Sequence, residues 1–392
     1  MNEILKQFGD IHPARAMDFD VLYAGLQSEV EAGYINKQVD KDLGLEIFKY
    51  SNSCTFEKHW NVFTLIARGL ILAPCEKMVV ATPFPKFFNY GEVSFDLPNG
   101  SFVSFEKMDG SLGIVYHWRN KWRVATCLSF LSDQSRWAEN YLNNVVSRSA
   151  LSYLIIGDTY LTEIIYPENR IVVKYDFNDL VLLSGYYKTG HEMQYDHVQD
   201  LGNKLKLRTA KVYEYSSIEN ILELSKTMSC DQEGFVLRFD NDYRLKIKGD
   251  EYCRVHRLIS RCTPLAIWDS MCSCDDFSAL LKFLPEEFIK DLTKIREIFT
   301  SKFDSFSSDL KSAMELTKDF SDKELGIAIA NNELKYSKNI LSCLFPCRKV
   351  NFWEEISRPG KLRSFVFRSF RPTNNILEGY TPSNAMNRFE DV

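Results

Sequence analysis

The stretch FEKMDGSLG, residues 105–113, places Lys107 two residues before an Asp-Gly pair. Apolar runs lie on both sides, so the stretch predicts the end of one strand, a tight turn and the start of another strand. Two interpretations fit this pattern. Asp-Gly is a common hairpin turn, and Lys107 would then be a solvated neighbour. Alternatively, the turn presents Lys107 as a nucleophile, and the rest of the chain has to decide between the two.

The composition is that of a folded protein of two or three domains, with 392 residues, 45% of them hydrophobic and 26% charged. The net charge of −5 means that nucleic-acid binding would depend on local basic patches. No apolar run is long enough for a membrane span, and the start MNEILKQFGD is unlike a signal peptide, so we expect a cytoplasmic protein with no membrane partner. The ten cysteines include no CxxC pair, which fits reduced thiols better than zinc or disulfides.

The pattern of apolar residues divides the chain near residue 260. Before it, short apolar runs predict antiparallel strands at 65–73, 113–118, 160–166, 169–175, 180–186, 234–239 and 243–248. Helices are expected at 133–146 and 216–228, the second opened by a capping box of Ser216 and Glu219. After it, Pro285 opens a long amphipathic helix, and a capping box of Ser321 and Glu324 opens another.

We therefore predict an α+β fold, with an antiparallel-sheet domain at 1–262, a mainly helical domain at 263–347 and a basic aromatic tail at 348–392. The tail contains RPGKLRSFVFRSFR, residues 358–371, which has no acidic residue. One interpretation is that Arg363, Arg368 and Arg371, with the interleaved aromatics, contact a nucleic acid. The other is that Phe365 and Phe367 face the core on a terminal strand.

Charged side chains interrupt several predicted strands. Lys246 and Lys248 alternate with Leu245 and Ile247, so both lysines face one side of their strand. This pattern fits either a phosphate-binding strand or a solvated face. Glu163 lies in the apolar run YLTEII, where an unpaired carboxylate is costly to bury. It therefore either faces solvent on an edge strand or contacts a ribose hydroxyl or a metal ion.

Taken in order, these features resemble a known set of motifs. Lys-x-Asp-Gly at 107–110, a strand glutamate at 163, Glu-Gly at 233–234 and Lys-x-Lys at 246–248 are similar to the motifs of covalent nucleotidyltransferases, the nucleic-acid ligases and mRNA capping enzymes. The upstream RG at 68–69 and KFFN at 86–89 narrow the resemblance to RNA ligases of the bacteriophage T4 RNA ligase 1 type. The resemblance covers about residues 48–256 and implies that the sheet domain is an adenylyltransferase, or nucleotidyltransferase, domain.

The resemblance implies a role for each matched residue. Lys107 takes AMP from ATP, Gly110 closes its turn, and Glu163 holds the ribose. Glu233 with Gly234 lies by the α-phosphate, and Glu233 and Asp275 are the candidate ligands of Mg2+ or Mn2+. The other residues implied to form the ATP site are Tyr50, Arg68, Lys86, Phe88, Lys246 and Lys248.

The reaction that the resemblance implies has three steps. Lys107 attacks the α-phosphate of ATP, AMP passes to an RNA 5′-phosphate, and an RNA 3′-hydroxyl displaces AMP, as in the repair of a nicked tRNA. A free lysine is almost entirely protonated at neutral pH. Cations crowded around Lys107 would favour the neutral, nucleophilic amine and hold the triphosphate.

One position departs from the family pattern. Cys127 and Leu128 stand where the family often has a basic residue and glycine, and Lys121 or Arg123 are the nearby basic residues. This departure is the best support for a rival interpretation, a catalytically inactive RNA-binding relative. Other rivals are a capping guanylyltransferase and a DNA ligase, but helices, and no predicted oligonucleotide-binding barrel, follow Lys248.

We expect ATP, and not GTP or NAD, to label the protein through an acid-labile, base-stable phosphoramidate at Lys107. The test is incubation with each α-labelled nucleotide and magnesium, followed by denaturing electrophoresis. Labelling that persists in Lys107→Ala would contradict the assignment of the nucleophile.

Overall fold

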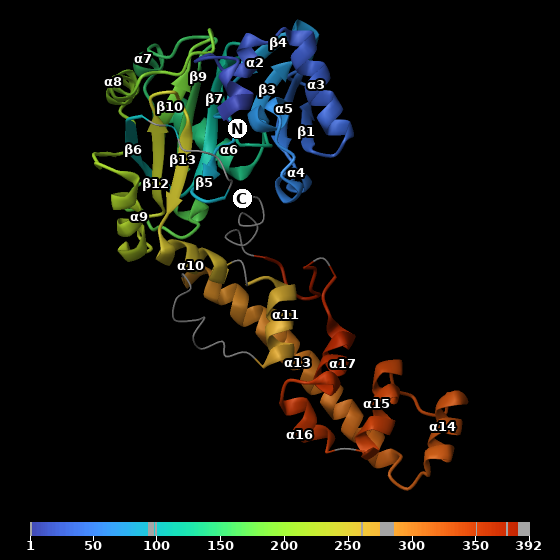
Figure 1. The fold of residues 1–392 in the computed structure, drawn as a ribbon. Helices are drawn as coiled ribbons and strands as arrows, with labels where there is room; N and C mark the ends of the chain where they lie inside the picture. Colours follow the sequence, from blue (N-terminus) through green and yellow to red (C-terminus); the bar gives the residue numbers. More distant parts are fainter. Residues whose placement is uncertain are drawn as a thin grey trace. The chain divides into compact units, whose positions relative to one another are not determined.

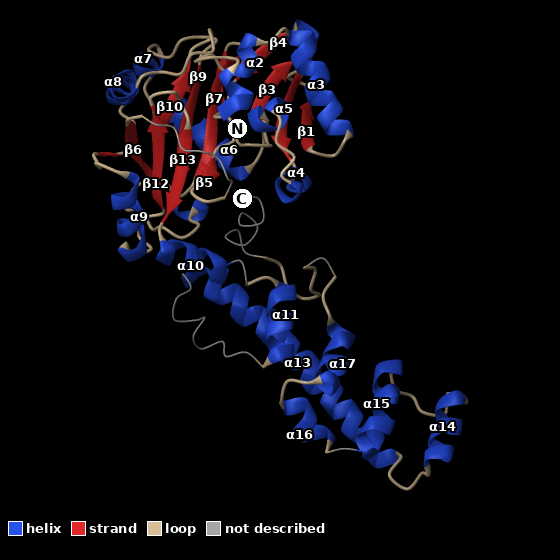
Figure 2. Cartoon of the chain, in the orientation of Figure 1, coloured by secondary structure: helices blue, strands red, loops and turns tan. Residues whose placement is uncertain are grey.

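A computed structural model describes residues 2–92, 98, 100–259, 262–274, 286–349, 351–373 and 375–382. The chain divides into two compact units, Met1–Cys253 and Arg254–Val392 (Figure 1). In the described residues, all strands belong to the first unit and the second is helical (Figure 2). The predicted α+β organisation, antiparallel sheets followed by helices, is therefore confirmed. None of the described helices is long and apolar enough to cross a membrane.

The first sheet is antiparallel and lies near the N-terminus (Figure 1). Its strands, in spatial order, are β1 (Ile35–Asp40), β2 (Leu45–Tyr50), β3 (Arg68–Ala73) and β4 (Met78–Ala81). The helices of this region are α1 (Asn2–Lys6), α2 (Pro13–Ala16), α3 (Phe19–Glu31), α4 (Asn52–Glu57), α5 (Val62–Ile66) and the 3-10 helix η1 (Pro74–Glu76).

Two further sheets complete the first unit. One has the order β10–β9–β7–β8, with β7 (Ser111–Trp118), β8 (Lys121–Ala125), β9 (Thr159–Ile165) and β10 (Asp179–Tyr186). The other has the order β11–β6–β12–β13–β5, with β5 (Phe88–Asn89), β6 (Phe102–Lys107), β11 (Val212–Tyr213), β12 (Gly234–Phe239) and β13 (Arg244–Lys248). The connecting helices are α6 (Asp133–Asn144), α7 (Arg148–Leu151), η2 (Pro167–Asn169), α8 (Tyr195–Leu205) and α9 (Ile218–Thr227).

Hydrophobic packing joins these sheets. Ile47 and Ile71 of the first sheet share a core with Ile114 and Leu161 of the second. A separate core lies on the third sheet, where Phe235 packs with residues of α9 and β5. The alternating apolar residues of β12 and β13 thus anchor one face of the third sheet, as the sequence pattern predicted.

The Asp-Gly pair does not form a hairpin, because β6 and β7 belong to different sheets. Asp109 is buried, and its Oδ2 accepts hydrogen bonds from the backbone N–H groups of Val172 (2.8 Å) and Val173 (2.7 Å). Gly110 lies so close to β9 that a Cβ there would be 2.6 Å from the carbonyl oxygen of Ile164. The turn is therefore a fixed passage from one sheet to the next.

The same contact explains why the strand predicted at 169–175 is wrong. Ile171, Val172 and Val173 are buried, which gives the apolar run its strand-like appearance. Their segment is a loop, because two of its N–H groups are used by the Asp109 carboxylate instead of a neighbouring strand. The other predicted strands correspond to β3, β7, β9, β10, β12 and β13.

Helix α9 begins at Ile218, two residues later than predicted, because its cap is Ser217 and not Ser216; Ser217 Oγ accepts from the N–H of Asn220. In the second unit the capping box of Ser321 and Glu324 is confirmed. The helices that follow α9 are α10 (Asp250–Ile259), α11 (Pro264–Ser273), α13 (Glu286–Leu316), α14 (Asp322–Ala330), α15 (Lys338–Lys349), α16 (Phe352–Ser357), α17 (Lys361–Phe367) and η3 (Arg368–Phe370).

The predicted apolar stripe of the long helix α13 is confirmed, since Phe288, Leu292, Ile295 and Phe299 are completely buried. Pro285, predicted to open this helix, lies outside the described residues. The terminal strand considered for residues 365–367 is wrong, because these residues belong to the helix α17.

The guanidinium of Arg363, on α17, donates to the carbonyl oxygens of Met271 and Ile356. Arg371 lies over the ring of Trp268, 5.4 Å from its centroid. Arg363 therefore stabilises the helical unit from within, so the expectation that it contacts RNA loses support.

We predict that Asp109→Ala lowers the free energy of unfolding by about 3 kcal/mol, because two buried N–H groups lose their acceptor. Asp109→Asn should lose less, since an amide oxygen can still accept both hydrogen bonds. Denaturant unfolding followed by circular dichroism measures the difference. Equal losses in the two variants would contradict this role for the Asp109 oxygen.

Candidate active site

Three neighbouring strands bring the charged motifs together. In the register of β6, β12 and β13, Gly234 lies opposite Lys107 on one side and opposite Lys248 on the other. Gly234 has a φ of +143°, and a Cβ there would be 2.1 Å from the carbonyl oxygen of Ile247. Only glycine fits this position, and the preceding residue, Glu233, lies between the two lysines.

The Glu233 carboxylate bridges the two lysines. Its Oε2 accepts from Lys107 Nζ at 2.5 Å, and its Oε1 lies 2.9 Å from Lys248 Nζ. The side chain of Glu233 is 3% exposed, against 20% for Lys107 and 27% for Lys248. Burial opposes ionisation of Glu233, but the two ammonium groups hold its pKa below the ordinary value. Glu233 is thus an ionised, buried carboxylate with both oxygens occupied.

Lys246 is not the solvated lysine that one interpretation of its strand allowed. Its neighbours Leu245 and Ile247 are buried on the other face, as predicted. Burial lowers the pKa of Lys246 well below its ordinary value, and the nearby cations, including Lys86 and Arg68, lower it further. In the described part of the chain, Lys246 forms no ion pair and Arg68 Nη1 is buried without a hydrogen-bond partner. This excess of buried positive charge favours an anionic ligand.

An aromatic box surrounds the ammonium group of Lys86. Its Nζ lies 5.3 Å from the ring centroid of Tyr50, 5.6 Å from that of Trp60 and 5.0 Å from that of Phe88. Burial lowers the pKa of Lys86, although Glu92, 4.0 Å away, acts in the opposite direction. Tyr50, Lys86 and Phe88, predicted from separate stretches of sequence, are therefore in contact.

Glu163 does not lie on an edge strand, because β9 has β10 on one side and β7 on the other. Its Oε1 accepts a hydrogen bond of 3.0 Å from the N–H of Gly110, in the turn that follows Lys107. Burial raises the pKa of Glu163 to about 8, and Lys107 acts against this shift. The solvent-facing interpretation is therefore wrong, and Glu163 lies beside the Lys107 turn.

Cys127 and Leu128, which stand where the family often has a basic residue and glycine, lie near Gly69, the residue after Arg68. A Cβ on Gly69 would be 3.2 Å from the Cα of Cys127, so β3 and the segment of Cys127 approach closely. Lys121 is paired with Glu139 on α6. Lys121 is therefore engaged elsewhere, and Arg123 remains the candidate to replace the missing basic residue.

Some residues of this region were missed in the sequence. Trp60 of the aromatic box belongs to no motif, and Phe87, whose ring lies 5.0 Å from the Arg68 guanidinium, stands inside the KFFN motif but was assigned no role. Tyr175, whose hydroxyl accepts from the N–H of Asp109 at 2.8 Å, gave no signal either. Asp109 is part of the Lys-x-Asp-Gly motif, but its burial could not be predicted because the residues that contact it are distant in the sequence.

Of the two predicted metal ligands, Glu233 and Asp275, the structure describes only Glu233. Asp275 lies outside the described residues. Within the ranges that the structure describes, no group of three or more His, Cys, Asp or Glu side chains is placed to hold a metal ion.

Comparison with known proteins shows which family the first unit resembles. Residues 66–252 match the profile of a family described as RNA ligase, of the T4 RNA ligase 1 type. The chain is 23% identical over 365 residues to the RNA ligase of Rhodothermus phage RM378. The matched residues cover 74% of this chain and 79% of the phage protein. Residues 66–252 are therefore similar to the RNA ligase family of the T4 RNA ligase 1 type, and the likeness to the phage enzyme extends beyond this region.

Other relatives share shorter regions. A protein of Autographa californica nuclear polyhedrosis virus, assigned as a bifunctional polynucleotide kinase/RNA ligase, is 27% identical over 263 residues, 60% of this chain. This chain spans only 37% of that protein. A solved structure of a Naegleria gruberi RNA ligase mutant with ATP and Mn is 18% identical with a TM-score of 0.33, covering 40% of this chain and 51% of that one.

We predict that the stability of the protein falls as pH rises from about 5 to about 8, in part because of Glu163. A carboxyl whose pKa is raised on folding binds its proton more tightly in the native state, so its contribution is full below the unfolded pKa and is lost as pH rises through the folded pKa. Glu163→Gln keeps the neutral shape and should flatten this dependence. Denaturant unfolding of both proteins at several pH values tests it, and parallel curves would contradict it.

Proposed function

We propose that this protein is an ATP-dependent RNA ligase in which Lys107 forms the covalent bond to AMP. The observation that supports it most is the bridge of Lys107 and Lys248 on the buried Glu233 carboxylate. Nearby are Lys246 and Arg68, which form no ion pair within the described residues. The match of residues 66–252 to the RNA ligase family supplies the reaction class. The assignment of individual site residues is part of this proposal.

In the first step, Lys107 Nζ attacks the α-phosphorus of ATP. An N–P bond forms, the bond from the α-phosphorus to the bridging oxygen breaks, and pyrophosphate leaves with the electron pair. Lys107 must lose a proton before the attack, and Glu233 Oε2 is the group in contact with its ammonium. Glu233 therefore holds Lys107 in place and is the nearest acceptor for its proton.

We propose that the remaining cationic side chains bind the phosphates of ATP. Lys246, Lys248, Lys86 and Arg68 surround the position that the phosphates would take, and negative charge moves toward pyrophosphate as the bond breaks. Burial and the neighbouring cations lower the pKa of Lys246, and a phosphate beside it would favour the charged form of this lysine.

The later steps follow from the same site. AMP passes from Lys107 to an RNA 5′-phosphate, and the 3′-hydroxyl of the other RNA end attacks that phosphate and releases AMP. We propose that Glu163, which accepts a hydrogen bond from the Gly110 N–H, contacts the ribose of AMP during the transfer. The substrates we propose are RNA ends with a 5′-phosphate and a 3′-hydroxyl, including those of a nicked tRNA.

A magnesium ion would neutralise charge on the triphosphate, and it is typically held by phosphate oxygens, water and one or two carboxylates. Each Glu233 oxygen accepts from one lysine and keeps a further lone pair, so this carboxylate would be able to hold the ion without releasing either lysine.

We predict that Lys248→Ala reduces formation of the lysyl-AMP on the order of a hundredfold or more, because a cation at the reacting phosphates is lost. Lys77→Ala, which removes an exposed lysine paired with Asp20, is the matched control and should label normally. The measurement is the rate of labelling by α-labelled ATP, followed by sealing of labelled RNA ends. Normal labelling of Lys248→Ala would contradict the proposed role.

A second variant separates the later steps from the first. Glu163→Ala should slow the sealing of an RNA strand that already carries AMP on its 5′-phosphate, because the ribose is then less firmly held. Sealing of that strand at the wild-type rate would show that Glu163 has no part in these steps.

A further inference from the structure

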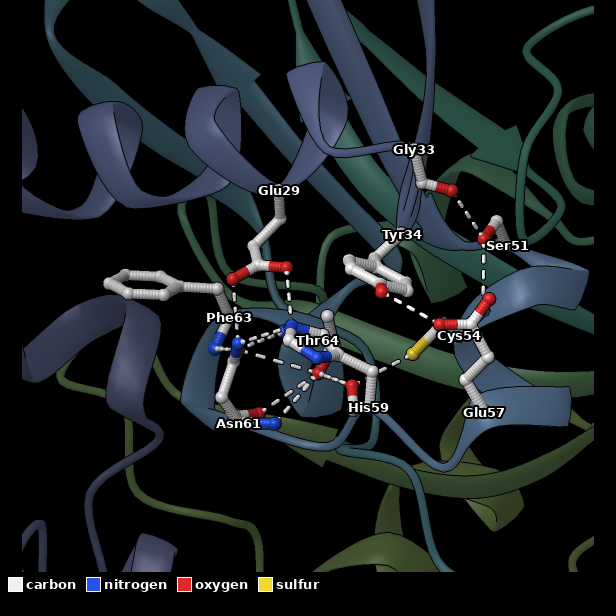
Figure 3. A network of polar contacts seen from close by, with 10 residues as sticks. All are labelled: Glu29, Gly33, Tyr34, Ser51, Cys54, Glu57, His59, Asn61, Phe63 and Thr64. Atoms are coloured by element: carbon white, nitrogen blue, oxygen red, sulfur yellow. Dashed lines mark hydrogen bonds and ion pairs between the residues drawn. The ribbon is translucent and has the colours of Figure 1, made fainter.

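A polar network outside the matched family region lies behind the proposed ATP site. It connects α3, α4 and α5 and includes Glu29, His59 and Asn61 (Figure 3). Glu29 Oε1 accepts from Asn61 Nδ2 at 2.6 Å, and its Oε2 lies 3.0 Å from His59 Nε2. The ring of His59 stacks on Tyr34, with centroids 3.8 Å apart. Both oxygens of one carboxylate are therefore used to hold a single loop.

That loop caps α5. Asn61 Oδ1 accepts from the N–H groups of Phe63 and Thr64, both at 3.0 Å, and Thr64 Oγ1 accepts from the N–H of Asn61 at 2.9 Å. The helix has only five residues, and a helix this short depends on its cap and its packing. Because the amide of Asn61 donates to Glu29, its oxygen must face the helix, so Glu29 sets the orientation of the cap.

Three residues of the proposed ATP site are attached to α5 through the backbone. The N–H of Lys86 donates to the carbonyl oxygen of Leu65 at 2.7 Å, and the N–H of Tyr50 donates to that of Ala67 at 2.7 Å. Arg68 follows Ala67 directly in the chain. A shift of α5 would therefore move Tyr50, Arg68 and Lys86 together.

The same loop also supplies Trp60, between His59 and Asn61. Its ring contacts those of Tyr50 and Phe88, with centroids 5.3 and 5.2 Å apart. By contrast, Lys107 lies on β6, in another sheet, and is held by Glu233. The network thus supports the residues around the nucleotide without supporting the nucleophile.

We propose that Glu29, acting through Asn61 and α5, is a positioning residue that aligns Tyr50, Arg68 and Lys86 for ATP. The inference rests on the proposed function, since it concerns ATP use by Lys107. Loss of this contact should raise the KM for ATP by a larger factor than it lowers the maximal rate of lysyl-AMP formation, because Lys107 keeps its own support while Arg68 and Lys86 shift.

The test exchanges the donor and the acceptor of the contact. Asn61→Asp keeps a good helix cap but opposes two carboxylates, and it should raise the KM for ATP about tenfold, the factor for losing one hydrogen bond to a charged group. In the double variant Asn61→Asp/Glu29→Gln, the amide introduced at position 29 donates to the new carboxylate, and the KM should return close to the wild-type value. Glu29→Gln alone, which still offers an oxygen to Asn61, should change the KM little.

Ser147→Ala is the matched stability control, because Ser147 caps the short helix α7 of the same unit without contacting α5. Thermal unfolding of every variant is measured beside lysyl-AMP formation at varied ATP. An unchanged KM in Asn61→Asp, a fall in maximal rate instead, or no recovery in the double variant would overturn this inference and leave the proposed function intact. A wild-type protein that ATP does not label would overturn both.

Discussion

The proposed site depends on two ion pairs that share one buried carboxylate, that of Glu233, which lies between the ammonium groups of Lys107 and Lys248. Two like charges on strands that flank β12 would repel each other without it. The register of three strands creates the arrangement, because Gly234 lies opposite both lysines and leaves no room for a side chain. The sheet thus brings the proposed nucleophile and the proposed phosphate-binding lysine to one carboxylate, from segments far apart in the sequence.

The second constraint is the passage from β6 to β7, which carries the chain from one sheet to another directly after Lys107. Asp109 fixes this passage by accepting two N–H groups of a loop about sixty residues away. Glu163 accepts the N–H of Gly110 from the neighbouring strand. The turn after the proposed nucleophile is therefore held at two positions, Asp109 and Gly110, which limits the movement of Lys107.

Sequence patterns predicted what depends on local periodicity and on the order of motifs. The alternation of Lys246 and Lys248 with buried Leu245 and Ile247 is an example, because one face of a strand is decided by its own residues. Contacts between segments distant in the sequence could not be predicted from these patterns; the contact of Trp60 with Lys86 is an example. The strand predicted at 169–175 failed for this reason, since a distant carboxylate accepts from its N–H groups. The hairpin, one of the two interpretations of the Asp-Gly pair, is excluded by the separate sheets of β6 and β7.

The central prediction is that AMP becomes attached to a single residue, Lys107, whose ammonium group donates to Glu233. The most direct measurement is mass spectrometry of peptides from the wild-type protein after incubation with ATP and magnesium, digested at neutral or alkaline pH to preserve the phosphoramidate. The expected result is AMP on Lys107 alone. AMP on Lys246, Lys248 or any other residue, or no adduct in a protein that seals RNA, would contradict the account.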